Sequence, residues 1–301
     1  MGRLVRMEEK LGLVLEGGGM RGVYTGGVLE RFMEDGLYFP YVIGVSAGAC
    51  NAVSYLSRQR ERNRRVTIDY VDRPEYLSVR NWIRQGSMFG MDFIFDRIPN
   101  EIDPLDYETL FAIRETFVVG ATDPETGEPT YYGNDVWARD KATFMAALRA
   151  SSSLPFFSPP VPVEGRLMFD GGVADPIPVR RALADGCDRV VVVLTKDASY
   201  RIKPFKRRRL AAWIYRRYPK LVEAMERRER VYNDSMALVR RLEAEGRAFV
   251  VQPSRQLPVG RMEKDKALLR QLYALGEADV DALRGKLQAW LEAGTPAGGR
   301  R

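Results

Sequence analysis

The stretch VIGVSAGAC, residues 42–50, places a serine between two glycines, directly after an apolar run and directly before a helix-like segment. A strand, a tight turn and a helix around a G-x-S-x-G sequence are typical of a nucleophile elbow, which raises a serine hydroxyl above a sheet. The five-residue pattern alone arises by chance in about one chain in ten, so the flanking strand and helix give it weight. Ser46 is therefore a candidate nucleophile; the alternative is that it only caps the following helix.

The chain has no histidine, the side chain that usually accepts the proton of a nucleophilic serine. A lysine at the S-x-x-K spacing is absent as well, because that position is Ala49, and a carboxylate becomes the leading candidate base. Asp170, in the sequence FDGG at residues 169–172, follows an apolar stretch. It would act as the base with the help of burial and a direct hydrogen bond. The alternative is a turn, for which an aspartate before glycines is typical.

A third glycine-rich sequence, EGGGMRG at residues 16–22, follows the apolar run at residues 11–15. Glycines at a helix start let backbone N–H groups face an anion, either a phosphate or a developing oxyanion. The same glycines match the G-x-G-x-x-G pattern of dinucleotide-binding proteins, which expects an acidic residue at the end of the second strand. Here that strand ends at Ser46 instead, so the nucleotide interpretation is disfavoured. A plain tight turn remains an alternative.

Taken together and in this order, EGGGMRG, GVSAG and DGG resemble the patatin-like phospholipase family, bacterial and plant lipid acyl hydrolases that use a serine and aspartate dyad. The sequence ASSSLP at residues 150–155 is similar to the A-S-x-x-x-P stretch that precedes the aspartate of that family. The resemblance covers roughly residues 11–178 and is strongest to bacterial members with a C-terminal extension. It accounts for a serine site without histidine.

The resemblance implies a role for each matching residue. Ser46 would be the nucleophile and Asp170 its base. The backbone amides of Gly17, Gly18 and Gly19 would form the oxyanion hole, and Arg21 would support that loop or bind a phosphate head group. The implied reaction is hydrolysis of an acyl lipid, a phospholipid or lysophospholipid, through an acyl-enzyme. The resemblance implies no metal and no organic cofactor.

Short apolar runs predict buried strands at residues 11–15, 41–45, 116–120, 189–195 and 248–252. Between them, helices are expected at residues 139–150, 178–184, 221–245 and 264–291, and a hairpin turn at residues 127–129. This order favours an α/β fold with a mainly parallel central sheet, and the family resemblance implies the same three-layer α/β/α sandwich. Residues 72–114 have no clear period and are expected to cover the sheet edge or the site.

The net positive charge of the chain is concentrated in one segment. Residues Arg201–Arg230 hold twelve Lys or Arg against three Glu, whereas the whole chain carries only +7. Trp213 and Tyr215 lie among these charges, a composition that suits an element lying on an anionic membrane. The alternative is a solvated helical face. Nucleic acid is not expected as a partner, since no known nucleic-acid motif accompanies the patch. A shorter basic run occupies residues 58–65.

We expect a patatin-like catalytic domain at residues 1–200, a basic helical extension packed on it at residues 201–296, and a disordered tail at residues 297–301. With two cysteines, no histidine and no apolar segment of signal or membrane-spanning length, the sequence predicts a cytoplasmic protein, either free or peripheral at the inner membrane face. The alternative function is a non-catalytic, membrane-associated binding protein of the same fold.

Overall fold

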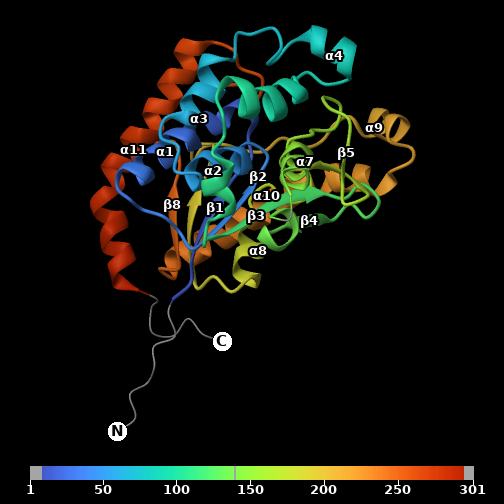
Figure 1. Ribbon diagram of the computed structural model, residues 1–301. Helices are drawn as coiled ribbons and strands as arrows, with labels where there is room; N and C mark the ends of the chain where they lie inside the picture. Colours follow the sequence, from blue (N-terminus) through green and yellow to red (C-terminus); the bar gives the residue numbers. More distant parts are fainter. Residues whose placement is uncertain (1–8, 139, 295–301) are drawn as a thin grey trace.

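The computed structural model describes residues 9–138 and 140–294, and a mixed sheet lies at the centre of the molecule (Figure 1). Within these residues the sheet has eight strands. The central strands are parallel, in the order β3-β2-β1-β7-β8, and are β1 (Leu11–Leu15), β2 (Tyr41–Val45), β3 (Thr116–Thr122), β7 (Arg189–Val193) and β8 (Ala248–Val251). The antiparallel strands are β4 (Pro129–Tyr132) and β6 (Arg166–Asp170), both paired with β3, and β5 (Val161–Val163), paired with β6.

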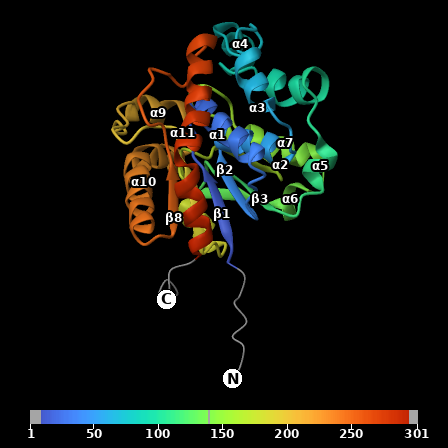
Figure 2. The same cartoon turned by 90° about the vertical axis from the view of Figure 1, so that its left-hand side faces the viewer.

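Helices cover both faces of the sheet, because successive side chains of the buried strands point to opposite sides. On β1, Leu13 and Leu15 pack in a core with α1 (Val23–Glu34), α2 (Ala47–Leu56) and α11 (Lys266–Ala293). Val14 packs in a second core with α8 (Val179–Ala184) and α10 (Pro219–Ala244). The expected three-layer α/β/α sandwich with a mainly parallel central sheet is therefore confirmed (Figures 1 and 2).

Helices α1 and α11 approach closely because each has a glycine at the contact. A Cβ at Gly27 would lie 2.1 Å from the carbonyl oxygen of Tyr273, and one at Gly276 would lie 2.3 Å from that of Tyr24. The Tyr24 hydroxyl also donates a 2.9 Å hydrogen bond to Asp279 of α11. The segment after residue 200 thus contributes both β8 and a tightly packed helix to the sandwich. The division at residue 200 stays a prediction.

The described residues form further helical elements besides these. They are η1 (Gly19–Gly22), α3 (Arg62–Arg64), η2 (Arg65–Asp69), α4 (Val79–Gln85), η3 (Phe93–Ile102), α5 (Tyr107–Phe111), α6 (Asn134–Trp137), α7 (Lys141–Ser151) and α9 (Arg208–Ile214). The predicted tail at residues 297–301 falls outside the described residues. In the described part of the chain, each helix is too short or too polar to cross a bilayer.

Candidate active site

Ser46 lies in the turn between β2 and α2. Its backbone has φ 53° and ψ −127°, a conformation that is rare and strained for a residue with a side chain. The flanking glycines let α2 pack close to the sheet, since a Cβ at Gly48 would lie 2.5 Å from the carbonyl oxygen of Leu15, and one at Gly44 would lie 2.6 Å from the amide of Ala49. The turn therefore has the geometry of a nucleophile elbow.

Asp170, at the end of β6, is buried beside Ser46. Its carboxylate accepts a 2.7 Å hydrogen bond from the Gly172 amide. Burial raises the pKa of Asp170 above its ordinary value, while the Ser46 hydroxyl, the Gly172 amide and the positive charges of Arg228 and Arg261 act in the opposite direction. The structure thus places the two residues of the predicted dyad at the same cavity.

The amides of the glycine loop differ in their hydrogen bonding. The Gly17 amide donates to the carbonyl of Pro176 at 3.4 Å, but within the described chain the amides of Gly18 and Gly19 have no hydrogen-bond acceptor. The amide of Ala47, directly after the candidate nucleophile, likewise has no hydrogen-bond acceptor among the described residues. Sequence reasoning missed Ala47, although its position in the elbow is a standard source of an oxyanion donor.

A buried ion pair lies behind the glycine loop. The Glu16 carboxylate pairs with Lys196 and accepts hydrogen bonds from the amide and the hydroxyl of Thr195, at 2.6 and 2.9 Å. Burial lowers the pKa of Lys196, and the charge of Glu16 opposes that change. Because Glu16 immediately precedes the loop, this network holds its start against the end of β7.

Arg21 points away from the substrate space. Its Nε donates a 2.9 Å hydrogen bond to the carbonyl of Val259, and Arg21 is not among the residues that line the cavity described below. Of the two roles expected for Arg21, this position fits support of the glycine loop, because it ties η1 to the segment between β8 and α11.

A cavity of about 250 Å³ opens in front of Ser46 and Asp170. Gly17, Gly18 and Gly19 line it as well. Much of the remaining lining is apolar, and five of its side chains come from residues 72–114: Tyr76, Phe89, Met91, Ile94 and Phe95. The expectation that this insertion covers the site is therefore confirmed. The shape and chemistry suit an acyl chain.

Two arginines from distant parts of the chain also line the cavity. Arg228, on α10, donates a 2.6 Å hydrogen bond from Nε to the carbonyl of Gly172, beside Asp170. Arg261 follows β8, and its carbonyl accepts a 3.1 Å hydrogen bond from the amide of Met20. Burial, followed by the charge of Arg261, lowers the pKa of Arg228.

The profile of the patatin-like phospholipase family matches residues 13–183. The chain belongs to this family. A second profile, that of a domain of unknown function (DUF6363), matches residues 218–292. The resemblance found in the sequence is thereby confirmed.

Individual relatives of this patatin-like chain are distant. The uncharacterized protein YjjU of Escherichia coli is 28% identical over 273 residues, which are 89% of this chain and 75% of that protein. Lysophospholipase NTE1 of Saccharomyces cerevisiae is 28% identical over 62% of this chain, but the match spans only 11% of the yeast protein. An uncharacterized NTE family protein of Mycobacterium tuberculosis is 27% identical over 61% of this chain and 48% of its own length. The crystal structure of VipD from Legionella pneumophila aligns with 14% identity and a TM-score of 0.43, covering 90% of this chain and 67% of that chain.

The matched regions divide the site of this patatin-like protein into two parts. Ser46, Asp170 and the glycine loop lie within the family match, whereas Arg228 and Arg261 lie within the match to DUF6363. Sequence reasoning noted the basic segment that contains Arg228 but placed neither arginine at the site. No local pattern connects them to Ser46, because they enter the cavity from α10 and from the loop after β8.

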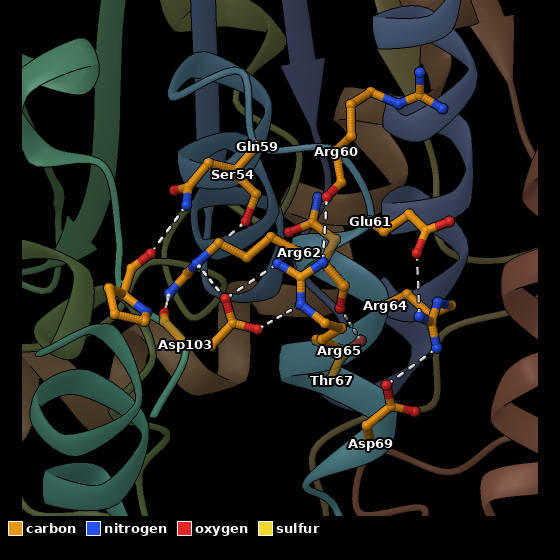
Figure 3. Close-up of polar contacts among 12 residues, drawn as sticks. Ser54, Gln59, Arg60, Glu61, Arg62, Arg64, Arg65, Thr67, Asp69 and Asp103 are labelled. Atoms are coloured by element: carbon orange, nitrogen blue, oxygen red, sulfur yellow. Dashed lines mark hydrogen bonds and ion pairs between the residues drawn. The ribbon is translucent and has the colours of Figure 1, made fainter. Parts of the chain in front are cut away.

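The shorter basic run, residues 58–65, borders the other part of the cavity and is paired with acids (Figure 3). Arg62 and Arg65 both pair with Asp103, at 3.5 and 2.6 Å, and Arg64 pairs with Asp69 at 3.0 Å. Arg62 also donates to the carbonyl of Asp103 at 2.9 Å. Ion pairs with acidic side chains therefore neutralise much of the charge of this run. The same ion pairs hold α3 and η2 in place as one wall of the cavity.

Proposed function

We propose that the protein is a serine acyl hydrolase that cleaves ester bonds of phospholipids or lysophospholipids. The observation that carries the proposal is that Ser46, in its strained turn, and the buried carboxylate of Asp170 line the same cavity, whose remaining lining is largely apolar. Membership of the patatin-like phospholipase family supports it, as does the similarity to a yeast protein named lysophospholipase.

In this proposal the Ser46 oxygen attacks the ester carbonyl while Asp170 accepts the hydroxyl proton. A base works best with a pKa near the working pH, and burial shifts the pKa of Asp170 in that direction. The tetrahedral oxyanion is stabilised by free amides at Gly18, Gly19 and Ala47, with Gly17 and Arg21 holding the loop in place. Asp170 then returns the proton to the leaving alcohol, and water hydrolyses the acyl-enzyme.

An exposed surface on two helices supports a position at an anionic membrane. On α9, Trp213 is 69% exposed, and on α4 Ile83 is 74% exposed. In Figure 2, α4 lies at the top of the molecule and α9 at its left-hand side. Exposed basic residues lie in α9 and on both sides of it: Lys206, Arg207, Arg209, Arg216 and Arg217. Aromatic and aliphatic side chains among such charges suit an element that lies at a membrane surface. We propose that the exposed side chains of α9 and its basic neighbours, within Arg201–Arg230, bind the membrane that contains the lipid substrate.

The test compares the wild type with Ser46→Ala and Asp170→Asn on nitrophenyl esters and on phospholipid vesicles. Each change is expected to lower kcat by roughly a thousandfold or more, because each removes a participant in the bond-making step. Ser57→Ala serves as the control and should retain activity. Ser57 is another buried serine, and within the described residues its hydroxyl bonds only to Ser54 and Gln59. Equal activity in all variants would exclude the proposed enzyme.

Labelling by a fluorophosphonate separates the enzyme from the alternative, a non-catalytic membrane-associated binding protein. An activated serine reacts covalently with this probe, so the wild type should be labelled at Ser46 and the Ser46→Ala variant should not. A wild type that binds lipid but neither reacts with the probe nor hydrolyses any ester would favour the binding protein.

A further inference from the structure

The guanidinium groups of Arg228 and Arg261 line the cavity without acidic partners of their own. Within the described residues, neither arginine forms an ion pair, and the side chain of Arg261 makes no hydrogen bond there. Arg228 uses its Nε for the carbonyl of Gly172. Most of the donors of both side chains therefore remain available to a ligand.

The two charges are close enough to affect one another, and both interact with the same carboxylate, Asp170. The charge of Arg261 disfavours the charged form of Arg228. Asp170 is the one carboxylate among the residues described as lining the cavity, and the two other lining cations, Lys196 and Arg62, are already paired with Glu16 and Asp103. Two adjacent cations facing a single buried carboxylate are stabilised by a further anion.

We propose that Arg228 and Arg261 bind the phosphate of the lipid substrate and select head groups with a net negative charge. This proposal rests on the proposed function, since the ester carbonyl must reach Ser46 while the phosphate lies at the arginines. Guanidinium groups bind phosphate oxygens through paired, charge-assisted hydrogen bonds. The apolar side chains of the insertion accept the acyl chain, and the arginines accept the polar end of the same molecule.

The same pair disfavours other lipids. A phosphocholine head group brings a quaternary ammonium toward two cations that share one carboxylate, and like charges in contact lower affinity. A neutral glyceride leaves both guanidinium groups without an anion. The patatin-like match covers residues 13–183, whereas both arginines lie within residues 218–292. The selection of the lipid head group therefore belongs to a part of the chain outside the patatin-like match.

The experiment measures kcat/KM for four lipids with one acyl chain: lysophosphatidic acid, lysophosphatidylglycerol, lysophosphatidylcholine and monoacylglycerol. The wild type should prefer the two anionic lipids by about tenfold or more. Arg261→Gln should lose about tenfold on the anionic lipids, mainly through KM, and little on monoacylglycerol. Arg261→Lys should recover part of the loss. Arg240→Gln, an exposed arginine on the same helix as Arg228, is the matched control and should not change the ranking.

Equal use of all four lipids by the wild type, or an equal loss on all four in Arg261→Gln, would overturn the phosphate site while leaving the hydrolase intact. Binding to the inactive Ser46→Ala variant tests the site without turnover. Calorimetry should show lysophosphatidic acid binding that is weakened about tenfold by adding Arg261→Gln. If inorganic phosphate bound as tightly as the lipid, the proposal that the two arginines select lipid head groups would be wrong. If the lipid bound as expected but no ester were cleaved, the hydrolase would fail and the anion site would stand.

Discussion

The amide of Ser46 donates a 2.8 Å hydrogen bond to the hydroxyl of Ser151, at the end of α7. The Ser151 hydroxyl in turn donates to the carbonyl of Gly120 on β3 at 2.6 Å. The carbonyl of Ser151 accepts a 3.3 Å hydrogen bond from the amide of Gly171, directly after Asp170. One residue outside the cavity lining thus holds both the strained elbow and the turn that carries the carboxylate.

Replacing Ser151 with alanine should therefore lower activity by misplacing the dyad. We expect kcat to fall about tenfold with little change in KM, and the free energy of unfolding to fall by about 1–3 kcal/mol, because the Ser46 amide and the Gly120 carbonyl lose a buried partner. Ester hydrolysis and urea unfolding measure the two effects. Ser153→Ala is the matched control. In the described part of the chain this hydroxyl bonds only to the carbonyl of Arg149, so stability should fall without a comparable loss of kcat.

Gly18→Ala should reduce activity because the loop has no room for a side chain. A Cβ at Gly18 would lie 2.7 Å from the Thr195 hydroxyl, so the loop or the hydroxyl must move. Since the loss of one oxyanion donor typically costs on the order of a hundredfold in kcat, we expect a loss of about that size. Gly260→Ala, near the same loop but with nothing within 4 Å of the added carbon, should keep its activity. If both variants were fully active, the glycine loop would not form the oxyanion hole.

The parallel strands could be predicted from the sequence because each is buried on both faces and reads as an apolar run. The strand predicted at residues 189–195 is two residues longer than the observed strand, because β7 ends at Val193 and the amide of Thr195 bonds to the Glu16 carboxylate. Strand β5 gave no signal: it is three residues long and contains the exposed Pro162, which suits only an edge strand. Short antiparallel edges lack the burial that makes a strand visible in a sequence.

The site was predictable where its parts are local motifs and not where they are tertiary contacts. Ser46 and the glycine loop each follow a strand, so the turn itself fixes their place at the carboxyl edge of the sheet. Asp170 follows an antiparallel strand, and its position at the same cavity as Ser46 depends on the pairing of β6 with β3. Arg228 and Arg261 reach the cavity only through the packing of α10 and of the loop after β8, which no periodicity describes.

Asp170→Asn should make the protein more stable at neutral pH, in contrast to most changes at buried sites. The pKa of Asp170 is raised by burial in the folded state, so the ionised carboxylate destabilises the fold at neutral pH. This penalty disappears as the pH falls through the raised pKa toward the ordinary aspartate value. The thermal midpoint of the variant should therefore exceed that of the wild type at pH 7, and the difference should shrink in acid.

Asp106→Asn is expected to change stability at pH 7 in the opposite direction to Asp170→Asn. Hydrogen bonds from the hydroxyl and the amide of Thr109 lower the pKa of Asp106, which caps α5. Its ionised form therefore stabilises the fold above the ordinary aspartate pKa, and this contribution is lost as the pH falls through the lowered value. The variant should be less stable than the wild type at pH 7. An Asp170→Asn variant that was also less stable would show that its carboxylate is not penalised by burial.

The exposed surface on α9 predicts salt-dependent binding to anionic vesicles. Trp213→Ala should weaken the partition of the protein to phosphatidylglycerol vesicles by about tenfold, because a large apolar side chain no longer enters the interface. The double change Arg216→Gln and Arg217→Gln should weaken it by roughly a further tenfold at low salt, and less at high salt, where surface charges are screened. Vesicle co-sedimentation at two ionic strengths measures both.

The control for charge is the double change Arg240→Gln and Arg241→Gln, which removes two adjacent exposed arginines from the other end of α10. If net charge alone drew the protein to the vesicle, both double variants would weaken binding equally, and α9 would have no special role. If α9 enters the interface, only the changes at Trp213, Arg216 and Arg217 should matter. Hydrolysis of a soluble nitrophenyl ester should then be unchanged in all of them, because none of these side chains lines the cavity.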